Sequence, residues 1–337
     1  MALAVAPHGN IEDLLRCPRT GAAMRLTEGA YVSAGDATVR FPVEGGILRA
    51  FVPHDRAEAD VTQDMKAFYE ANPFPNYEDL DNVGSLIQKS LDRGFPEMLN
   101  RSIPPHATVL EVGCGTGQLG NFLSIAGRRV LSVDMCLNSL RLAQRFKDHH
   151  GLSGVTFGQM NLFRMPLPDA AFDVVLCTGV LHHTNDAQGG FRGLLSFLRP
   201  GGHVIVGLYN RYGRAQTRTR RLLAGWIGDR VAALDPYLSR HHVEGEKRQA
   251  WVMDQYRNPH ESLHTMDEVL RWFTADNISF VRAVPSTIFG SRFEMDYHHS
   301  LFEPEGPGSR MDRLLSQLSQ MVTDTEGGLF IMIGTKP

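Results

Sequence analysis

A glycine-rich turn directly follows a short apolar strand near residue 113, and only a few folds contain that pair. Residues 109–112 read Val-Leu-Glu-Val, a run typical of a strand buried on both faces of a parallel sheet. Gly-Cys-Gly-Thr-Gly follows at 113–117, where glycine permits positive φ and lets a ligand approach main-chain atoms. Apolar residues at helical spacing over 119–126 then indicate a helix. The pattern predicts a strand, a ligand-binding turn and a helix.

A second strand is expected at 130–133, and Asp134 follows it. This is the carboxyl end of the strand, where open α/β sheets bind ligands. Residues 115–120 also satisfy the G-x-G-x-x-G pattern of dinucleotide-binding folds, with Asp134 as the downstream acid. The turn by itself therefore indicates a nucleoside cofactor and leaves an NAD-dependent oxidoreductase open.

The surrounding phrases resemble a known family. Glu-Val-Gly-Cys-Gly-Thr-Gly at 111–117, with an acid two residues before the first glycine, resembles motif I of the class I S-adenosylmethionine-dependent methyltransferases. Asn161 and Phe172-Asp173 occupy the places where that family meets the adenine and begins its fourth strand. Thr-Gly-Val-Leu-His-His at 178–183 resembles the quinone-biosynthesis members. The resemblance implies an α/β fold with a doubly wound, seven-stranded Rossmann-like sheet whose last strand, 329–333, is antiparallel.

The resemblance also implies the cofactor, S-adenosyl-L-methionine, and the residues that hold it. Glu111 is expected to orient the amino group, Asp134 to accept both ribose hydroxyls, and Thr178 to line the sulfur end. The family usually has Asp where this chain has Asn161, whose amide oxygen can still accept from the adenine amine. The expected set is Tyr69, Glu111, Gly113, Cys114, Gly115, Gly117, Asp134, Met135, Asn161, Leu162 and Thr178.

The expected reaction is methyl transfer to an O, N or C nucleophile of a small molecule, in which the protein supplies alignment and, where needed, a base. Candidate bases are His182, His183 and His264. No metal site is expected, because adjacent histidines do not share a face of a helix or strand.

Three segments are expected along the chain. Residues 1–55 form a small β-rich unit, 56–106 a linker and helices that cover the cofactor, and 107–337 the methyltransferase domain. That domain departs from the minimal fold by insertions at about 209–264 and 285–326.

The N-terminal unit has a resemblance of its own. Leu-Leu-Arg-Cys-Pro-Arg-Thr-Gly at 14–21 and Phe-Pro-Val-Glu-Gly-Gly-Ile-Leu at 41–48 are similar to the zinc-ribbon-derived activator domain found beside methyltransferases. Only Cys17 remains of that family's Cys-x-x-Cys pairs, so we predict a degenerate unit without metal. A small β-meander packed on the catalytic domain is the alternative.

Composition narrows the function classes. The net charge of −3 gives no basic field for nucleic acid, and no apolar run approaches the roughly 20 residues of a membrane-spanning helix. The N-terminal stretch is too short and lacks the basic residues of a signal peptide, so a cytoplasmic location is expected. The four cysteines have no paired spacing, which argues against a disulfide framework.

An arginine-rich stretch opens the first insertion, with Arg211, Arg214, Arg218, Arg220 and Arg221 and no acid among them. It suggests a grip on an anionic substrate or partner, against the alternative of a solvated helix face. A non-catalytic adaptor that binds a protein through this stretch and the N-terminal unit is therefore a second function left open. The oligomeric state is not predicted.

Overall fold

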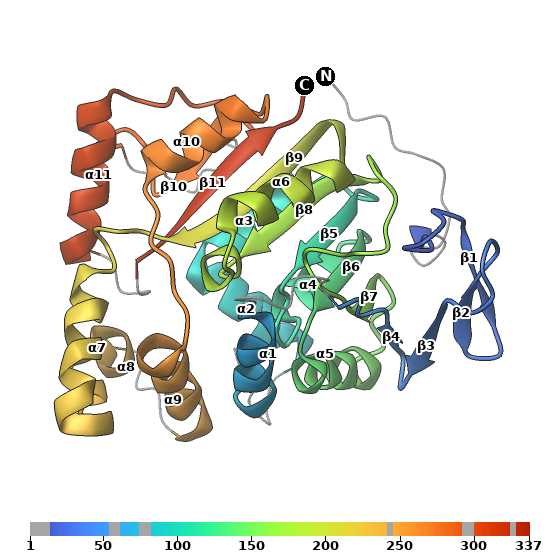
Figure 1. Ribbon diagram of the computed structural model, residues 1–337. Helices are drawn as coiled ribbons and strands as arrows, with labels where there is room; N and C mark the ends of the chain where they lie inside the picture. Colours follow the sequence, from blue (N-terminus) through green and yellow to red (C-terminus); the bar gives the residue numbers. More distant parts are fainter. Residues whose placement is uncertain (1–13, 54–60, 74–81, 241–244, 292–299, 324–327) are drawn as a thin grey trace.

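The computed structural model describes residues 14–53, 61–73, 82–240, 245–291, 300–323 and 328–337. Their strands form one eleven-stranded sheet (Figure 1). Its parallel centre runs, in spatial order, β4 (Ile47–Arg49), β7 (Val155–Gln159), β6 (Arg129–Asp134), β5 (Thr108–Val112), β8 (Phe172–Thr178) and β9 (Leu198–Tyr209). The order reverses beside β5, which makes the carboxyl end of β5 the place where such sheets bind ligands.

The two edges of the sheet are antiparallel. Beyond β9 lie β11 (Leu329–Thr335) and then β10 (Ser279–Val284). The opposite edge continues from β4 through β3 (Arg40–Glu44), β2 (Ala30–Ser33) and β1 (Met24–Thr27). The α/β class and the antiparallel last strand are confirmed, whereas the count of seven strands is wrong. The N-terminal strands join the sheet because Leu48 and Arg49 pair in parallel with β7.

Strand residues alternate between two helical layers, as the period of a β-strand requires. Val109, Val130 and Val174 face a layer made of α2 (Val83–Arg93), α3 (Phe95–Ser102), α4 (Gln118–Ser124) and α5 (Leu137–His149). Leu110, Leu131 and Val175 face the opposite layer, made of α6 (Ala187–Phe197) and α10 (Met266–Ala275). Met24, Tyr31, Phe41 and Leu48 of the N-terminal strands pack into this second cluster. Helix α11 (Arg310–Thr323) contacts α10.

The first insertion has a small core of its own, in which Val231, Trp251 and Tyr256 are buried. Its elements are α7 (Ala215–Ile227), η3 (Gly228–Leu234), α8 (Pro236–Arg240), α9 (Gly245–Val252) and the π-helical turn η4 (Met253–Arg257). Helix α1 (Thr62–Ala71) lies between this insertion and α5 (Figure 1). Among the described residues, no helix is long and apolar enough to cross a membrane.

Candidate functional site

The glycine turn closes tightly over the ends of β5 and β6. The amides of Gly113 and Cys114 both donate to the Val133 carbonyl, at 2.7 and 3.0 Å. Gly113, Gly115 and Gly117 have φ of 75°, 53° and 70°, a region that favours glycine. A Cβ on Gly113 would lie 2.1 Å from Val180 Cγ2, so a larger residue would also displace the loop after β8. The conformation of this turn and its close packing against the rest of the protein therefore require glycine.

Asp134 joins this turn to the start of α5. Its Oδ2 accepts from the Gly115 amide and its Oδ1 from the Cys136 amide, both at 2.8 Å. Burial raises the pKa of the Asp134 carboxyl, while the backbone hydrogen bonds oppose that rise. Each carboxylate oxygen can accept a further donor, so the pair of oxygens fits the two ribose hydroxyls of a nucleoside.

Glu111 lies in the interior, beneath the turn. Its Oε2 accepts from the Ser132 hydroxyl at 2.6 Å, and a Cβ on Gly120 would come within 2.7 Å of that oxygen. Burial, together with the nearby Asp134 charge, raises the pKa of Glu111 to about 7. An acid held this way is suited to a cationic neighbour, because a positive charge would stabilise its ionised form.

The loop after β7 is tied to the N-terminal segment. Asn161 is buried; its Nδ2 donates to the Val52 carbonyl at 3.1 Å, and its Oδ1 accepts from the Phe163 amide at 3.1 Å. Both ends of the Asn161 amide therefore have protein partners, and the neighbouring Leu162 is half-buried. The expected contact of Asn161 with adenine therefore stays a prediction. The main chain of Leu162 is a better candidate for that contact than the Asn161 side chain.

Four expected cofactor residues remain: Met135, Cys114, Thr178 and Tyr69. The Met135 carbonyl accepts from Gln159 Nε2 at 2.9 Å, and the buried thiol of Cys114 has a raised pKa because it is desolvated. Thr178 ends β8 and lies opposite Gly207. A Cβ added to Gly207 would lie 2.9 Å from the Cβ of Thr178. Tyr69 instead points into the first insertion: its hydroxyl donates to Asp254 Oδ1 at 2.8 Å.

The three candidate histidines differ sharply. His264 has both ring nitrogens engaged, Nδ1 by Glu268 Oε1 at 2.9 Å and Nε2 by Ser262 Oγ at 2.8 Å. His182 is fully buried, and neither of its ring nitrogens has a partner among the described residues. Its ring packs on Tyr209, with centroids 3.9 Å apart.

His183 has one nitrogen fixed. Its Nδ1 lies 2.7 Å from the His260 carbonyl, a contact that requires the proton on Nδ1 and leaves Nε2 as an acceptor. Burial lowers the pKa of His183, although the Asp254 carboxylate and the His260 contact oppose that effect. The ring is therefore held neutral in the tautomer that a general base needs.

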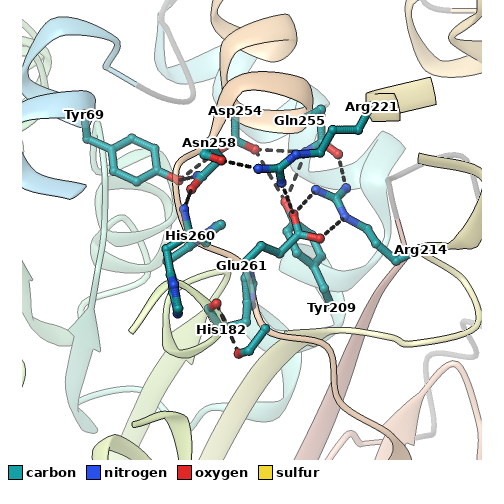
Figure 2. A network of polar contacts seen from close by, with 12 residues as sticks. Tyr69, His182, Tyr209, Arg214, Arg221, Asp254, Gln255, Asn258, His260 and Glu261 are labelled. Carbon is teal, nitrogen blue, oxygen red and sulfur yellow. Dashed lines mark hydrogen bonds and ion pairs between the residues drawn. The ribbon is translucent and has the colours of Figure 1, made fainter. Parts of the chain in front are cut away.

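A buried polar network lies beside His182 and His183, whose rings contact Tyr209, and was not expected from the sequence. Figure 2 shows its residues together with His182. Arg214 is fully buried and binds Glu261 through two nitrogens, with its guanidinium carbon 3.8 Å from the centroid of the Tyr209 ring. Gln255 Nε2 donates to the Tyr209 hydroxyl at 3.0 Å and to Asp254 Oδ2 at 2.9 Å.

One hypothesis was that the arginine-rich stretch lies on a solvent-exposed helix face. It is correct for Arg218, which is exposed, and wrong for Arg214, which is buried. A run of polar residues over 254–261, Asp-Gln-Tyr-Arg-Asn-Pro-His-Glu, is the sequence feature that could have indicated the network. Several of these side chains are buried, which is unusual for so many polar residues in one segment. Among the described residues, no group of three or more His, Cys, Asp or Glu side chains is placed to hold a metal ion.

Comparison with known proteins gives three points of reference. Residues 110–206 match the family model described as a methyltransferase domain. The uncharacterized protein syc1184_c of Synechococcus sp. is 26% identical over 266 residues, which cover 68% of this chain and 63% of that protein. The ubiquinone biosynthesis O-methyltransferase of Marinobacter nauticus is 36% identical over 159 residues, 45% of this chain and 57% of its own length. The chain thus spans less than two thirds of either relative.

Among solved structures, PKMT2 from Rickettsia typhi in complex with AdoHcy superposes with a TM-score of 0.50. The match covers 72% of this chain and 52% of that chain at 14% sequence identity. At this level of identity the likeness concerns the fold alone.

Proposed function

We propose that this chain, whose core is a class I S-adenosylmethionine-dependent methyltransferase domain, methylates a hydroxyl oxygen of a small-molecule acceptor with His183 as the base. The observation that carries the proposal is the contact between His183 Nδ1 and the His260 carbonyl, 2.7 Å long, at the carboxyl edge of the sheet. The activity and the acceptor are proposals for the chain as a whole.

The residues of the turn fit the cofactor. Gly113, Gly115 and Gly117 would lie against the methionine part of the cofactor. Asp134 would accept hydrogen bonds from the ribose hydroxyls, and the Glu111 carboxylate would stabilise the positively charged amino group. When bound, S-adenosylmethionine supplies a methyl group made electrophilic by the sulfonium. The protein's own contribution is to orient the two reactants and to exclude water around them.

His183 gives the protein a way to move a proton. A hydroxyl oxygen becomes a good nucleophile when its proton leaves, and the Nε2 of a neutral imidazole accepts that proton. The proton then resides on His183, where the nearby carboxylate of Asp254 favours the charged ring. His182 and His264 are poorer candidates for the base. The His182 ring is packed against the Tyr209 ring, and both ring nitrogens of His264 are hydrogen-bonded.

Oxygen is the favoured nucleophile for two reasons. A base is of most use where the acceptor atom carries a proton that must leave, as a hydroxyl does. The relative from Marinobacter nauticus is named an O-methyltransferase of ubiquinone biosynthesis, and its similarity covers 45% of this chain. We therefore propose a hydroxylated, aromatic or similarly weakly acidic acceptor.

Calorimetry tests the cofactor, and labelled turnover tests the reaction. S-adenosylhomocysteine should bind with a dissociation constant of about 1 μM to 1 mM, the span usual for KM values, and NAD should not bind. A cofactor with a deuterated methyl group, incubated with cell extract and the protein, should yield a labelled product by untargeted mass spectrometry. Tight binding of NAD alone would favour an oxidoreductase, and cofactor binding with no labelled product from any extract would favour the adaptor.

The base is tested by two matched variants. His183→Ala should lower the turnover rate by roughly 10²- to 10⁴-fold, the usual contribution of a general base. His264→Gln should retain the rate to within a few fold, because that ring is committed to Glu268 and Ser262. Equal losses in the two variants would reject His183 as the base.

A further inference from the structure

Two adjacent residues of helix α1, Tyr69 and Glu70, hold opposite sides of the site. On one side, Glu70 Oε1 accepts from the Leu137 amide at 2.7 Å and Oε2 from the Asn138 amide at 2.8 Å. Asn138 Nδ2 returns a hydrogen bond to the Glu70 carbonyl at 2.9 Å. A carboxylate at the start of α5 satisfies amides that the helix leaves unpaired and is favoured by the helix dipole.

The same helix start carries Asp134. Three consecutive amides, 136 to 138, donate to two carboxylates: the first to Asp134 and the next two to Glu70. Asp134 also holds the Gly115 amide of the glycine turn. The positions of α1 and of the residue expected to bind the ribose are therefore fixed against the same short stretch of main chain.

On the other side, the Tyr69 hydroxyl donates to Asp254 Oδ1 at 2.8 Å and accepts from Asn258 Nδ2 at 2.9 Å (Figure 2). Asn258 Oδ1 in turn accepts from the His260 amide at 3.1 Å, and the His260 carbonyl faces His183. Tyr69 is thus connected to the proposed base through Asn258 and His260.

The other contacts of helix α1 are weaker: Cys136 Sγ lies 3.7 Å from the Lys66 carbonyl, and Lys66 Nζ lies 5.3 Å from the centroid of the Phe51 ring. The helix has ten residues, shorter than an isolated helix needs for stability in water, and Met65 is its one fully buried side chain. Its packing surfaces are α5 and the insertion. Its position should therefore depend on how well each of these two neighbours is ordered.

We propose that Tyr69 and Glu70 are positioning residues that couple the two halves of the site, so that cofactor binding at 134–138 orders the insertion around Asp254 and Asn258. The inference rests on the methyl-transfer function proposed above. It predicts that cofactor binding holds the proposed base more firmly in place, and by reciprocity that an acceptor tightens cofactor binding.

Hydrogen exchange followed by mass spectrometry tests the coupling on the full chain, with S-adenosylhomocysteine as the probe. In the unmodified protein, saturating probe should slow exchange by about fivefold or more in peptides spanning 137–142 and also in those spanning 253–262. Tyr69→Phe should keep the dissociation constant within about threefold and keep the effect at 137–142, but lose it at 253–262. Tyr212→Phe, a tyrosine of the same insertion outside the network, is the matched control and should keep both effects.

Glu70→Gln tests the cofactor side. It should raise the dissociation constant by about fivefold and weaken protection in both segments, because the charged cap on α5 is lost. Asp64→Asn, in the first turn of the same helix, should behave like the unmodified protein. Protection at 253–262 that persists in Tyr69→Phe, or that is absent from the unmodified protein with probe bound, would reject the coupling while leaving methyl transfer intact. Failure of the probe to bind at all would reject both.

Discussion

Arg214 and Glu261 form a two-point ion pair that is almost wholly shielded from water. Arg214 Nε lies 3.0 Å from Glu261 Oε1 and Nη2 lies 2.5 Å from Oε2, with the two side chains 1% and 6% exposed. Two buried charges cost much desolvation, and their attraction offsets that cost only while both are present. The pair therefore fixes where the chain after β9 meets the end of the insertion, and with it the positions of Tyr209 and Gln255.

Removing one partner of this pair should be costly. Arg214→Ala leaves the buried Glu261 carboxylate with only the half-exposed Arg221, 3.8 Å away, as a cation. The free energy of unfolding should therefore fall by about 3 kcal/mol, the lower end of the cost of breaking a buried ion pair. Arg218→Ala, one turn along and exposed, should change it by no more than about 0.5 kcal/mol. Denaturant titrations of both variants make the comparison, and Arg214→Ala/Glu261→Ala should recover part of the loss. A single-variant loss as small as that of Arg218→Ala would mean that the pair is not buried in solution.

Glu111 should make stability depend on pH. Its pKa in the folded protein is raised from 4.5 to about 7, so the folded chain keeps a proton that the unfolded chain releases. The contribution of Glu111 is most favourable below pH 4.5 and is lost as the pH rises to about 7. Glu111→Gln removes this loss, so without cofactor it should exceed the unmodified protein in stability at pH 8 by up to about 3 kcal/mol. Melting curves at pH 5 and pH 8 test this, and a difference independent of pH would contradict it.

The same substitution should weaken the cofactor. If the Glu111 carboxylate stabilises the positively charged amino group of the cofactor, Glu111→Gln should raise the S-adenosylmethionine dissociation constant. The same change should stabilise the protein without cofactor. Such opposed effects are expected where a binding site keeps an unfavourable buried charge. Calorimetry on the sample used for melting supplies the second measurement. Improved stability with unchanged affinity would place Glu111 outside the cofactor site.

Asp134 should matter more for the cofactor than any other single carboxylate. Charge-assisted hydrogen bonds contribute roughly 1.5–3 kcal/mol each, so Asp134→Ala should raise the S-adenosylmethionine dissociation constant by at least about tenfold. The empty protein should also lose some stability, because the amides of Gly115 and Cys136 lose their acceptor. Asp169→Ala, at an acid outside the turn, is the control for calorimetry and melting. Unchanged affinity in Asp134→Ala would assign Asp134 a structural role only.

The rate of methyl transfer should persist into mildly acidic solution. A base acts in its neutral form, and burial lowers the pKa of His183. The acid limb of the kcat/KM profile should therefore lie below pH 6.5, the ordinary pKa of histidine. Asp254→Asn removes a carboxylate that favours the charged ring and should move this limb to still lower pH. A limb above pH 6.5, or one unmoved in Asp254→Asn, would argue for a different base.

The N-terminal unit is predicted to hold no zinc, because Cys17 is the one thiol within residues 1–55 and a structural zinc site needs four ligands. Elemental analysis of the purified chain should find far less than one zinc per molecule, and a chelator should leave the melting temperature unchanged. About one zinc per chain, lost in Cys17→Ser, would overturn this.

Much of the fold follows from short stretches of sequence. The apolar runs before Gly113 and Asp134 predicted two strands, and the spacing of apolar residues predicted the helix between them, because each pattern is read within a few residues. The strand count was wrong for the opposite reason. The pairing of Leu48 with Gly158 joins residues more than a hundred positions apart, and nothing local in either segment specifies it.

The sequence by itself determined the turn, the placement of Asp134 at the carboxyl edge of the sheet, and the three histidines that are candidate bases. Tertiary structure decided which histidine has its Nδ1 fixed by a backbone carbonyl, that Arg214 is buried, and that Tyr69 reaches Asp254 across 185 positions of chain. Periodicity and turn chemistry act over a few residues, so they encode elements and their ends. A hydrogen bond between distant segments depends on how those elements pack, and only the folded chain specifies that.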